Sequence, residues 1–195
     1  MTNTEKRINR DHERWIMSFY RSSEITGALF FGRIAGYLPA GPIQSDLTHH
    51  FADESMHACY WTKAMDECGY QPERIKDAYQ DAYLDAVGLP VNMMEILAIT
   101  SVFEHRVIAQ YAKHLRVPNL NPYIANTIET IMEDEKWHIK WIGDALKQME
   151  SEYGKDTIKS TLKRYQKADK EIYHKLVSEN QERLDFILKK PEKIA

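Results

Sequence analysis

The sequence contains the string Asp-Glu-x-x-His twice, at residues 53–57 and 134–138. Each copy follows a further glutamate at almost the same distance, 30 residues in the first case and 31 in the second. Residues three apart on a helix lie on one face, so each Glu-x-x-His offers a carboxylate and an imidazole to one point. Four facing helices would then assemble the ligands of a carboxylate-bridged di-metal site. The candidate metal ligands are Glu24, Glu54, His57, Glu104, Glu135 and His138.

A single Glu-x-x-His is a weak indication of metal binding, and a third copy occurs at residues 171–174. Lys170 precedes this copy in place of an aspartate, and no partner glutamate stands at the matching offset, so we interpret it as surface sequence. The other two copies agree in order, spacing and preceding aspartate. Four carboxylates buried together would also repel one another and lose hydration, and two divalent cations would cancel their charge. The pattern therefore favours a di-metal site over a purely structural bundle.

Composition narrows the class of protein. The length of 195 residues suits one domain over 1–195, and 43% hydrophobic with 28% charged residues is ordinary for a soluble globular protein. A net charge of −3 gives no indication of nucleic-acid binding. No stretch approaches the roughly 18 apolar residues of a membrane span, and no apolar signal segment follows the start, so a cytoplasmic location is expected.

The two cysteines do not indicate a redox or iron–sulfur site. Cys59 and Cys68 are nine residues apart on one predicted helix, which is too far for a disulfide bond. No Cys-x-x-Cys is present, so neither a rubredoxin-type iron site nor an iron–sulfur cluster is expected.

Helical periodicity predicts an all-α fold, a four-helix bundle over about 11–153 with an extra C-terminal helix. Short loops make antiparallel neighbours within each half, and one long crossover joins the second bundle helix to the third. The C-terminal helix is expected to pack against the bundle or against an oligomer partner, as in a homodimer. The expected helices lie at about 11–38, 43 or 45 to 68, 73–86, 91–115, 123–153 and 157–188.

Small and aromatic residues surround the first glutamate on the inner face of its helix. Gly27 and Ala28 lie about one turn from Glu24, and Tyr20 and Phe31 lie further along on either side. Close helix packing explains the small residues, and space for dioxygen or a substrate explains them equally well. These four neighbours are our candidate substrate-pocket residues.

A further histidine shares the face of the first Glu-x-x-His. His50 lies two turns before His57 and could serve as a seventh ligand. We interpret it instead as a buried histidine that is hydrogen-bonded at the end of the core. The adjacent His49 is expected to point elsewhere.

As a set, these features resemble the ferritin-like superfamily of non-haem diiron carboxylate proteins, over about residues 11–153. The resemblance implies that the six candidate ligands hold two iron ions. It implies that Glu54 and Glu135 bridge the ions, whereas Glu24 and Glu104 are terminal ligands, one on each ion. Imidazole and carboxylate ligands are also compatible with manganese at one or both positions.

The resemblance also assigns roles to neighbours of the ligands. Asp53 and Asp134 match carboxylates that hold the ligand histidines in one tautomer. Tyr111, two turns beyond Glu104, matches a tyrosine found at that offset in aldehyde-deformylating oxygenases, although a packing role explains it too.

Within the superfamily, the chain looks closest to small diiron oxygenases such as the aldehyde-deformylating oxygenase. Bacterioferritin has a haem-ligating methionine directly after the bridging glutamate, where this chain has Ser55, and rubrerythrins usually add a rubredoxin segment. The expected function is an O₂-dependent oxidoreductase that uses dioxygen to oxidise a small organic substrate. The sequence has no flavin or nicotinamide motif, so electrons are expected from outside the chain, and the resemblance implies a ferredoxin or a similar donor. A ferroxidase or iron-storage protein, and a rubrerythrin-like peroxidase, are the alternatives.

Overall fold

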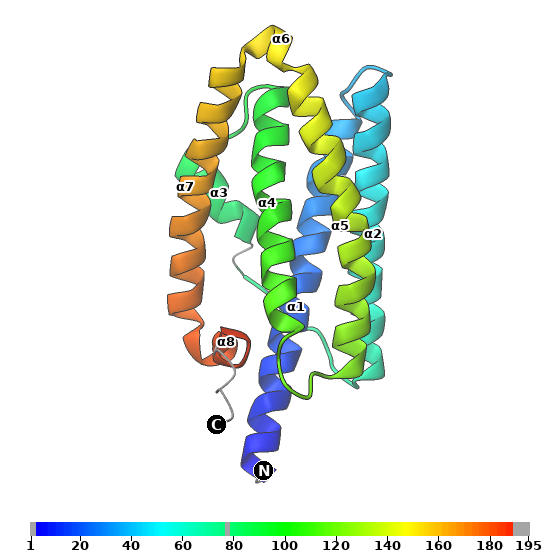
Figure 1. The fold of residues 1–195 in the computed structure, drawn as a ribbon. Helices are drawn as coiled ribbons and strands as arrows, with labels where there is room; N and C mark the ends of the chain where they lie inside the picture. The colour runs from blue at the N-terminus through cyan, green and yellow to red at the C-terminus, as the bar shows by residue number, and fades with distance from the viewer. Residues whose placement is uncertain (1–2, 77–78, 189–195) are drawn as a thin grey trace.

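The protein is an all-helical bundle in the computed structural model, which describes residues 3–76 and 79–188 (Figure 1). This confirms the predicted all-α fold class. No helix within the described residues is both long and apolar enough to cross a membrane. In chain order the helices are α1 (Asn3–Ala35), α2 (Pro42–Glu67), α3 (Tyr79–Val87), α4 (Met93–His114), α5 (Pro122–Gln148), α6 (Glu150–Tyr153), α7 (Lys155–Glu179) and α8 (Gln181–Leu188).

Four long helices form the bundle that carries the candidate ligands. Helix α1 packs against α2, α2 packs against α5, and α5 packs against α4. Figure 1 shows α1 and α5 running in one direction and α2 and α4 running in the other. The connection over residues 68–92, which includes α3, returns the chain from the end of α2 to the opposite end of the bundle. A long crossover therefore separates two helical hairpins, as the spacing of the sequence predicts.

Local sequence signals set the ends of the bundle helices. Asn92 caps α4, because its side chain accepts a hydrogen bond of 2.9 Å from the backbone N–H of Glu95. Asn121 caps α5 in the same way, and Pro122 supplies the preset φ angle of a first helical residue. Gly69, with a φ of 66°, turns the chain out of α2 in a left-handed conformation that glycine adopts without steric cost.

Several predicted boundaries are wrong. Helix α1 begins at Asn3 rather than near 11 and ends at Ala35 rather than 38. The helix predicted at 73–86 is seen from Tyr79, and residues 77 and 78 of that range lie outside the described residues. The fourth bundle helix, predicted at 123–153, is interrupted at Met149, and the short helix α6 begins at Glu150.

The C-terminal helix predicted at 157–188 is two helices, α7 and α8. Asn180 separates them, because its backbone leaves the helical conformation and its side chain donates a hydrogen bond of 3.1 Å to the carbonyl of Leu176. The backbone N–H of Asn180 donates to the same carbonyl, so α7 closes at this residue and the chain turns there. Helix α8 then packs against α1, while α7 packs against α4 and α3.

A partly buried ion pair fixes α7 on the bundle. Asp169 of α7 accepts a hydrogen bond of 3.0 Å from Nε of Arg106 on α4 and one of 2.9 Å from the hydroxyl of Tyr79 on α3. Tyr83 also donates to Asp169. Three helices are therefore tied to one carboxylate, and the predicted packing of the C-terminal segment against the bundle is observed.

Two hydrophobic clusters lie on either side of the candidate ligands. One cluster uses residues such as Met17, Trp61 and Ile128, and the other uses residues such as Leu47 and Ile142. On each bundle helix the acidic or histidine ligand lies between residues of the two clusters in sequence. The apolar layers therefore shield the polar centre from solvent at both ends.

Candidate metal centre

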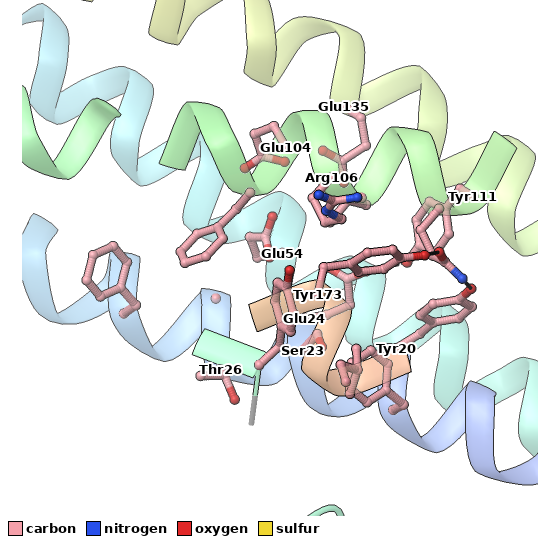
Figure 2. A pocket seen from close by; sticks show the side chains of 18 of the residues that line it. Tyr20, Ser23, Glu24, Thr26, Glu54, Glu104, Arg106, Tyr111, Glu135 and Tyr173 are labelled. Carbon is pink, nitrogen blue, oxygen red and sulfur yellow. Dashed lines mark hydrogen bonds between the residues drawn. The ribbon is translucent and has the colours of Figure 1, made fainter. Parts of the chain in front are cut away.

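All six predicted ligands are buried at the same level of the bundle. The four glutamates expose at most 6% of their surface, and His57 and His138 expose none. One glutamate comes from each of the four bundle helices, α1, α2, α4 and α5. Figure 2 shows the carboxylates of Glu24, Glu54, Glu104 and Glu135 lying around one space.

The ligand atoms form two groups, and within each group they lie within 4.8 Å of one another. Glu54 belongs to both groups. Glu135 belongs to the first, and its Oε2 also lies 3.1 Å from Nδ1 of His138 in the second. The bridging roles that the resemblance implies for these two glutamates stay a prediction. The first group is Glu24, Glu54, His57 and Glu135, and the second is His50, Glu54, Glu104 and His138.

The first group fits a metal ion because its polar atoms converge without bonding to one another. Nδ1 of His57 and Oε1 of Glu135 are buried and have no hydrogen-bond partner within the described part of the chain. They lie 3.6 Å apart, and the same Nδ1 lies 3.7 Å from Oε2 of Glu24, distances too long for good hydrogen bonds. An ion between them would satisfy all three atoms. One imidazole with several carboxylates suits iron or manganese.

Each candidate ligand histidine contacts an aspartate from the other copy of the motif. Nε2 of His57 on α2 lies 3.2 Å from Oδ2 of Asp134 on α5, and Nε2 of His138 on α5 lies 3.2 Å from Oδ2 of Asp53 on α2. The Nε2 atoms are therefore engaged, and both Nδ1 atoms face the carboxylates. Such partners fix the tautomer and the ring orientation of metal ligands.

Burial raises the pKa of two of the carboxylates. Burial, with the nearby charge of Glu24, raises the pKa of Glu54 to about 8. Burial and the charge of Glu104 raise the pKa of Glu135 well above its usual range. In the absence of a cation these two groups retain protons near neutral pH. A divalent cation would displace these protons, so metal binding is coupled to proton release.

The histidines respond to the same environment in opposite directions. Burial opposes protonation of His57, but the nearby negative charges of Glu24 and Glu54 outweigh burial and raise the pKa to about 9. Burial and the nearby charge of His50 lower the pKa of His138 to about 4. For Glu104, burial opposes ionisation, but the hydrogen bond and charge of His50 prevail and lower the pKa to about 2.

His50 lies inside the centre rather than at the end of the core. Its Nε2 is 3.2 Å from Oε1 of Glu54 and 3.1 Å from Oε1 of Glu104, and its side chain is fully buried. The hydrogen bond predicted for this histidine is present, but its partners are two metal-ligand candidates. The sequence signal for this position is the spacing of His50, Glu54 and His57, which lie on one face of α2.

Tyr111 contacts the centre through Glu24. Its hydroxyl donates a hydrogen bond of 2.6 Å to Oε1 of Glu24 and accepts one of 3.1 Å from Nε1 of Trp61. Burial and the charge of Glu24 raise the pKa of Tyr111 well above its usual range, so the phenol keeps its proton and remains a donor. The tyrosine therefore fixes the carboxylate of one candidate ligand.

A cavity of about 170 Å³ opens onto the four carboxylates. Its lining away from them is mainly aromatic and aliphatic, and comes from α1, α3, α4, α7 and α8. Among the four predicted pocket residues, Tyr20, Gly27 and Phe31 line this cavity. Ala28 does not line it, although it is buried, because it lies 100° further round the helix than Gly27.

The third Glu-x-x-His is separate from this centre. Glu171 and His174 lie on α7 and are exposed, as predicted for surface sequence. Neither residue belongs to the two groups of ligand atoms.

Comparison with known proteins gives no match. No protein-family model matches the chain, and neither does any curated protein or solved structure. The structure itself gives an all-helical bundle with two adjacent, buried carboxylate–histidine clusters that could each hold a metal ion.

Proposed function

We propose that this protein is a diiron oxidoreductase of the ferritin-like kind that uses dioxygen to oxidise a small, apolar organic substrate. The main support for this proposal is that a cavity with a mainly apolar lining opens directly onto the carboxylates of two adjacent groups of candidate ligands. Ligand pockets are typically apolar with a few polar groups at the point of reaction. The two helical hairpins joined by a long crossover support the ferritin-like assignment.

The residues of the chain hold and insulate the reacting centre. When bound, a pair of iron ions supplies the redox chemistry that dioxygen activation requires. Glu54 and Glu135 balance the charge of both positions, and Tyr111 fixes Glu24 by a hydrogen bond. The apolar clusters at either end exclude water and strengthen the electrostatic interactions between the ligands.

Charge in the cavity favours a neutral substrate. Arg106 lines the cavity, but its guanidinium is paired with Asp169. Gln110 also lines it, and its amide oxygen accepts a hydrogen bond of 2.7 Å from the hydroxyl of Tyr173. Both of these polar groups are engaged by protein partners. The carboxylates among the lining residues are those of the candidate centre and that of Asp81 on α3. Electrons would come from an external donor such as a ferredoxin.

The ligand assignment is tested by metal content. Glu54→Ala is expected to lose both iron ions, because its carboxylate reaches both groups of ligand atoms. Glu171→Ala, which removes the exposed glutamate of the third Glu-x-x-His, is the matched control and is expected to keep both. Iron per chain after anaerobic loading is the measurement. Equal loss of iron in the two variants would contradict the assignment.

Oxidation of an organic substrate is tested with a variant in which a larger side chain fills part of the cavity. Val107 lines the cavity on α4, and Val107→Phe would occupy space next to the centre without removing a ligand. The variant is expected to keep two iron ions per chain and to consume oxygen, but to lose oxidation of apolar substrates. A panel of small hydrocarbons, alcohols and aldehydes serves as the probe. Unchanged substrate oxidation would place the substrate elsewhere.

The two alternative functions predict different results in the same preparation. An iron-storage protein would accumulate far more than two iron ions per chain and form a large cage in size-exclusion chromatography. A rubrerythrin-like peroxidase would consume hydrogen peroxide rapidly in the diferrous form without any organic substrate.

A further inference from the structure

We propose that His50 is a seventh protein ligand, which binds through Nε2 the ion that Glu104 and His138 hold. This inference rests on the proposed metal centre and adds an asymmetry to it. One ion would have two imidazole ligands, His50 and His138, and the other would have only His57. The two metal positions would therefore differ chemically.

The first observation is the position of Nε2 of His50. It lies 3.1 Å from Oε1 of Glu104 and 3.2 Å from Oε1 of Glu54, on two different helices. Ligands at right angles around one ion, with bonds of about 2.1 Å, lie about 3 Å from one another. A single N–H aligns well with only one acceptor, whereas an ion between the three atoms would engage all of them.

The second observation is the setting of the imidazole ring. Nδ1 of His50 is buried and has no hydrogen-bond partner among the residues described, so the polar contacts of the ring are all on the Nε2 side. The ring stacks on His138, with centroids 3.6 Å apart, and packs against Phe31 on another side, with centroids 4.2 Å apart. These neighbours hold Nε2 toward the carboxylates.

The third observation is that the two copies of the motif differ at the residue four positions before the glutamate. His50 stands four residues before Glu54, and the equivalent position before Glu135 is Ile131, which is fully buried. Ile131 belongs to a hydrophobic cluster and offers no donor atom. The extra imidazole is therefore supplied by α2, and α5 has no counterpart.

The asymmetry has a consequence for metal loading. Imidazole favours iron, whereas a carboxylate-rich set of ligands also suits manganese. The two ions should bind in separate steps, with iron entering the position of His50 and His138 first. In a mixture of iron and manganese, manganese would concentrate in the position of His57.

Counting ligand imidazoles in the cobalt(II)-loaded protein tests the proposal directly. Ligand histidines give paramagnetically shifted, exchangeable ring N–H signals in the proton NMR spectrum. Three such signals are expected, from Nε2–H of His57, Nε2–H of His138 and Nδ1–H of His50. Two signals from protein that binds two cobalt ions would overturn the proposal but leave the metal centre intact. Failure to bind cobalt or iron would instead refute the proposed function.

Variants assign the third signal and measure its effect on affinity. His50→Gln is expected to give two signals, whereas His49→Gln, at a mainly exposed neighbour, should keep three. Loss of a group that orients a ligand typically lowers metal affinity by roughly 10–100-fold. In an iron(II) titration, His50→Ala should lower the affinity of the first binding step by more than that. Asp53→Asn provides that reference, because Asp53 contacts the ligand His138. A smaller effect for His50→Ala than for Asp53→Asn would contradict direct ligation.

Discussion

Replacement of Gly27 by alanine should remove metal binding without harming the fold. A Cβ at this position would overlap Oε2 of Glu54 and lie 3.3 Å from its Cδ. The carboxylate must move by at least about half an ångström, which exceeds the roughly 0.2 Å tolerance of metal–ligand distances. Because Glu54 belongs to both ligand groups, both ions should be affected.

The apo protein should respond to this change in the opposite direction. Alanine in place of glycine within a helix stabilises it by about 1 kcal/mol, and the displaced group is the end of a flexible side chain. In a protein of this size that gain corresponds to a Tm about 2–4 °C higher. Gly143→Ala is the matched control, because Gly143 lies within α5 and a Cβ there meets nothing within 4 Å.

Thermal unfolding with and without iron(II), under anaerobic conditions, separates the two effects. Each tenfold loss of affinity removes about 1.4 kcal/mol of the stabilisation that excess metal provides. We expect Gly143→Ala to keep the full metal-dependent rise in Tm and Gly27→Ala to lose most of it. If Gly27→Ala binds two ions with unchanged affinity, the carboxylate of Glu54 is not a ligand in the position seen here.

Three further predictions concern protons and hydrogen bonds. The folded apo protein holds protons on Glu54 up to about pH 8 and on His50 and His57 up to about pH 9, whereas unfolded histidines are already neutral above about pH 6.5. The Tm of the apo protein should therefore fall between about pH 6.5 and 9, and the Tm of the metal-loaded protein should not. A Tm of the apo protein that does not change over this range would refute this. Metal binding near pH 7 should release protons, so calorimetry in buffers of different ionisation enthalpy should give different apparent enthalpies, and equal enthalpies would contradict the protonated apo centre. Tyr111→Phe should lower the free energy of unfolding by about 1–3 kcal/mol, because Glu24 and Trp61 lose a buried partner, and a neutral effect in chemical denaturation would contradict that role.

Spacing in the sequence was sufficient to predict which residues form the candidate metal centre. Glu54 with His57, and Glu135 with His138, follow from the helical repeat, and Glu24 and Glu104 follow only because the order repeats. The structure buries all six together.

Contacts between helices could not be predicted in the same way. Nothing in the sequence shows that Asp53 meets His138 or that Nε2 of His50 reaches Glu104, because these pairs lie 85 and 54 residues apart. The prediction that Ala28 lines the pocket is wrong because neighbouring residues on a helix point about 100° apart, so Gly27 faces the cavity and Ala28 does not. The break at Asn180 was missed because Leu184 and Ile187 continue the apolar pattern of α7 into α8.

The crossed aspartate–histidine pairs give the centre an approximate two-fold symmetry. Asp53 completes a ligand on the second hairpin, and Asp134 completes one on the first, so neither hairpin carries a finished site. A single ancestral hairpin could have completed the site only by pairing with a second copy of itself. Fusion of two copies through the connection at residues 68–92 would preserve this reciprocity and let the two halves carry different residues at matched positions, such as His50 and Ile131.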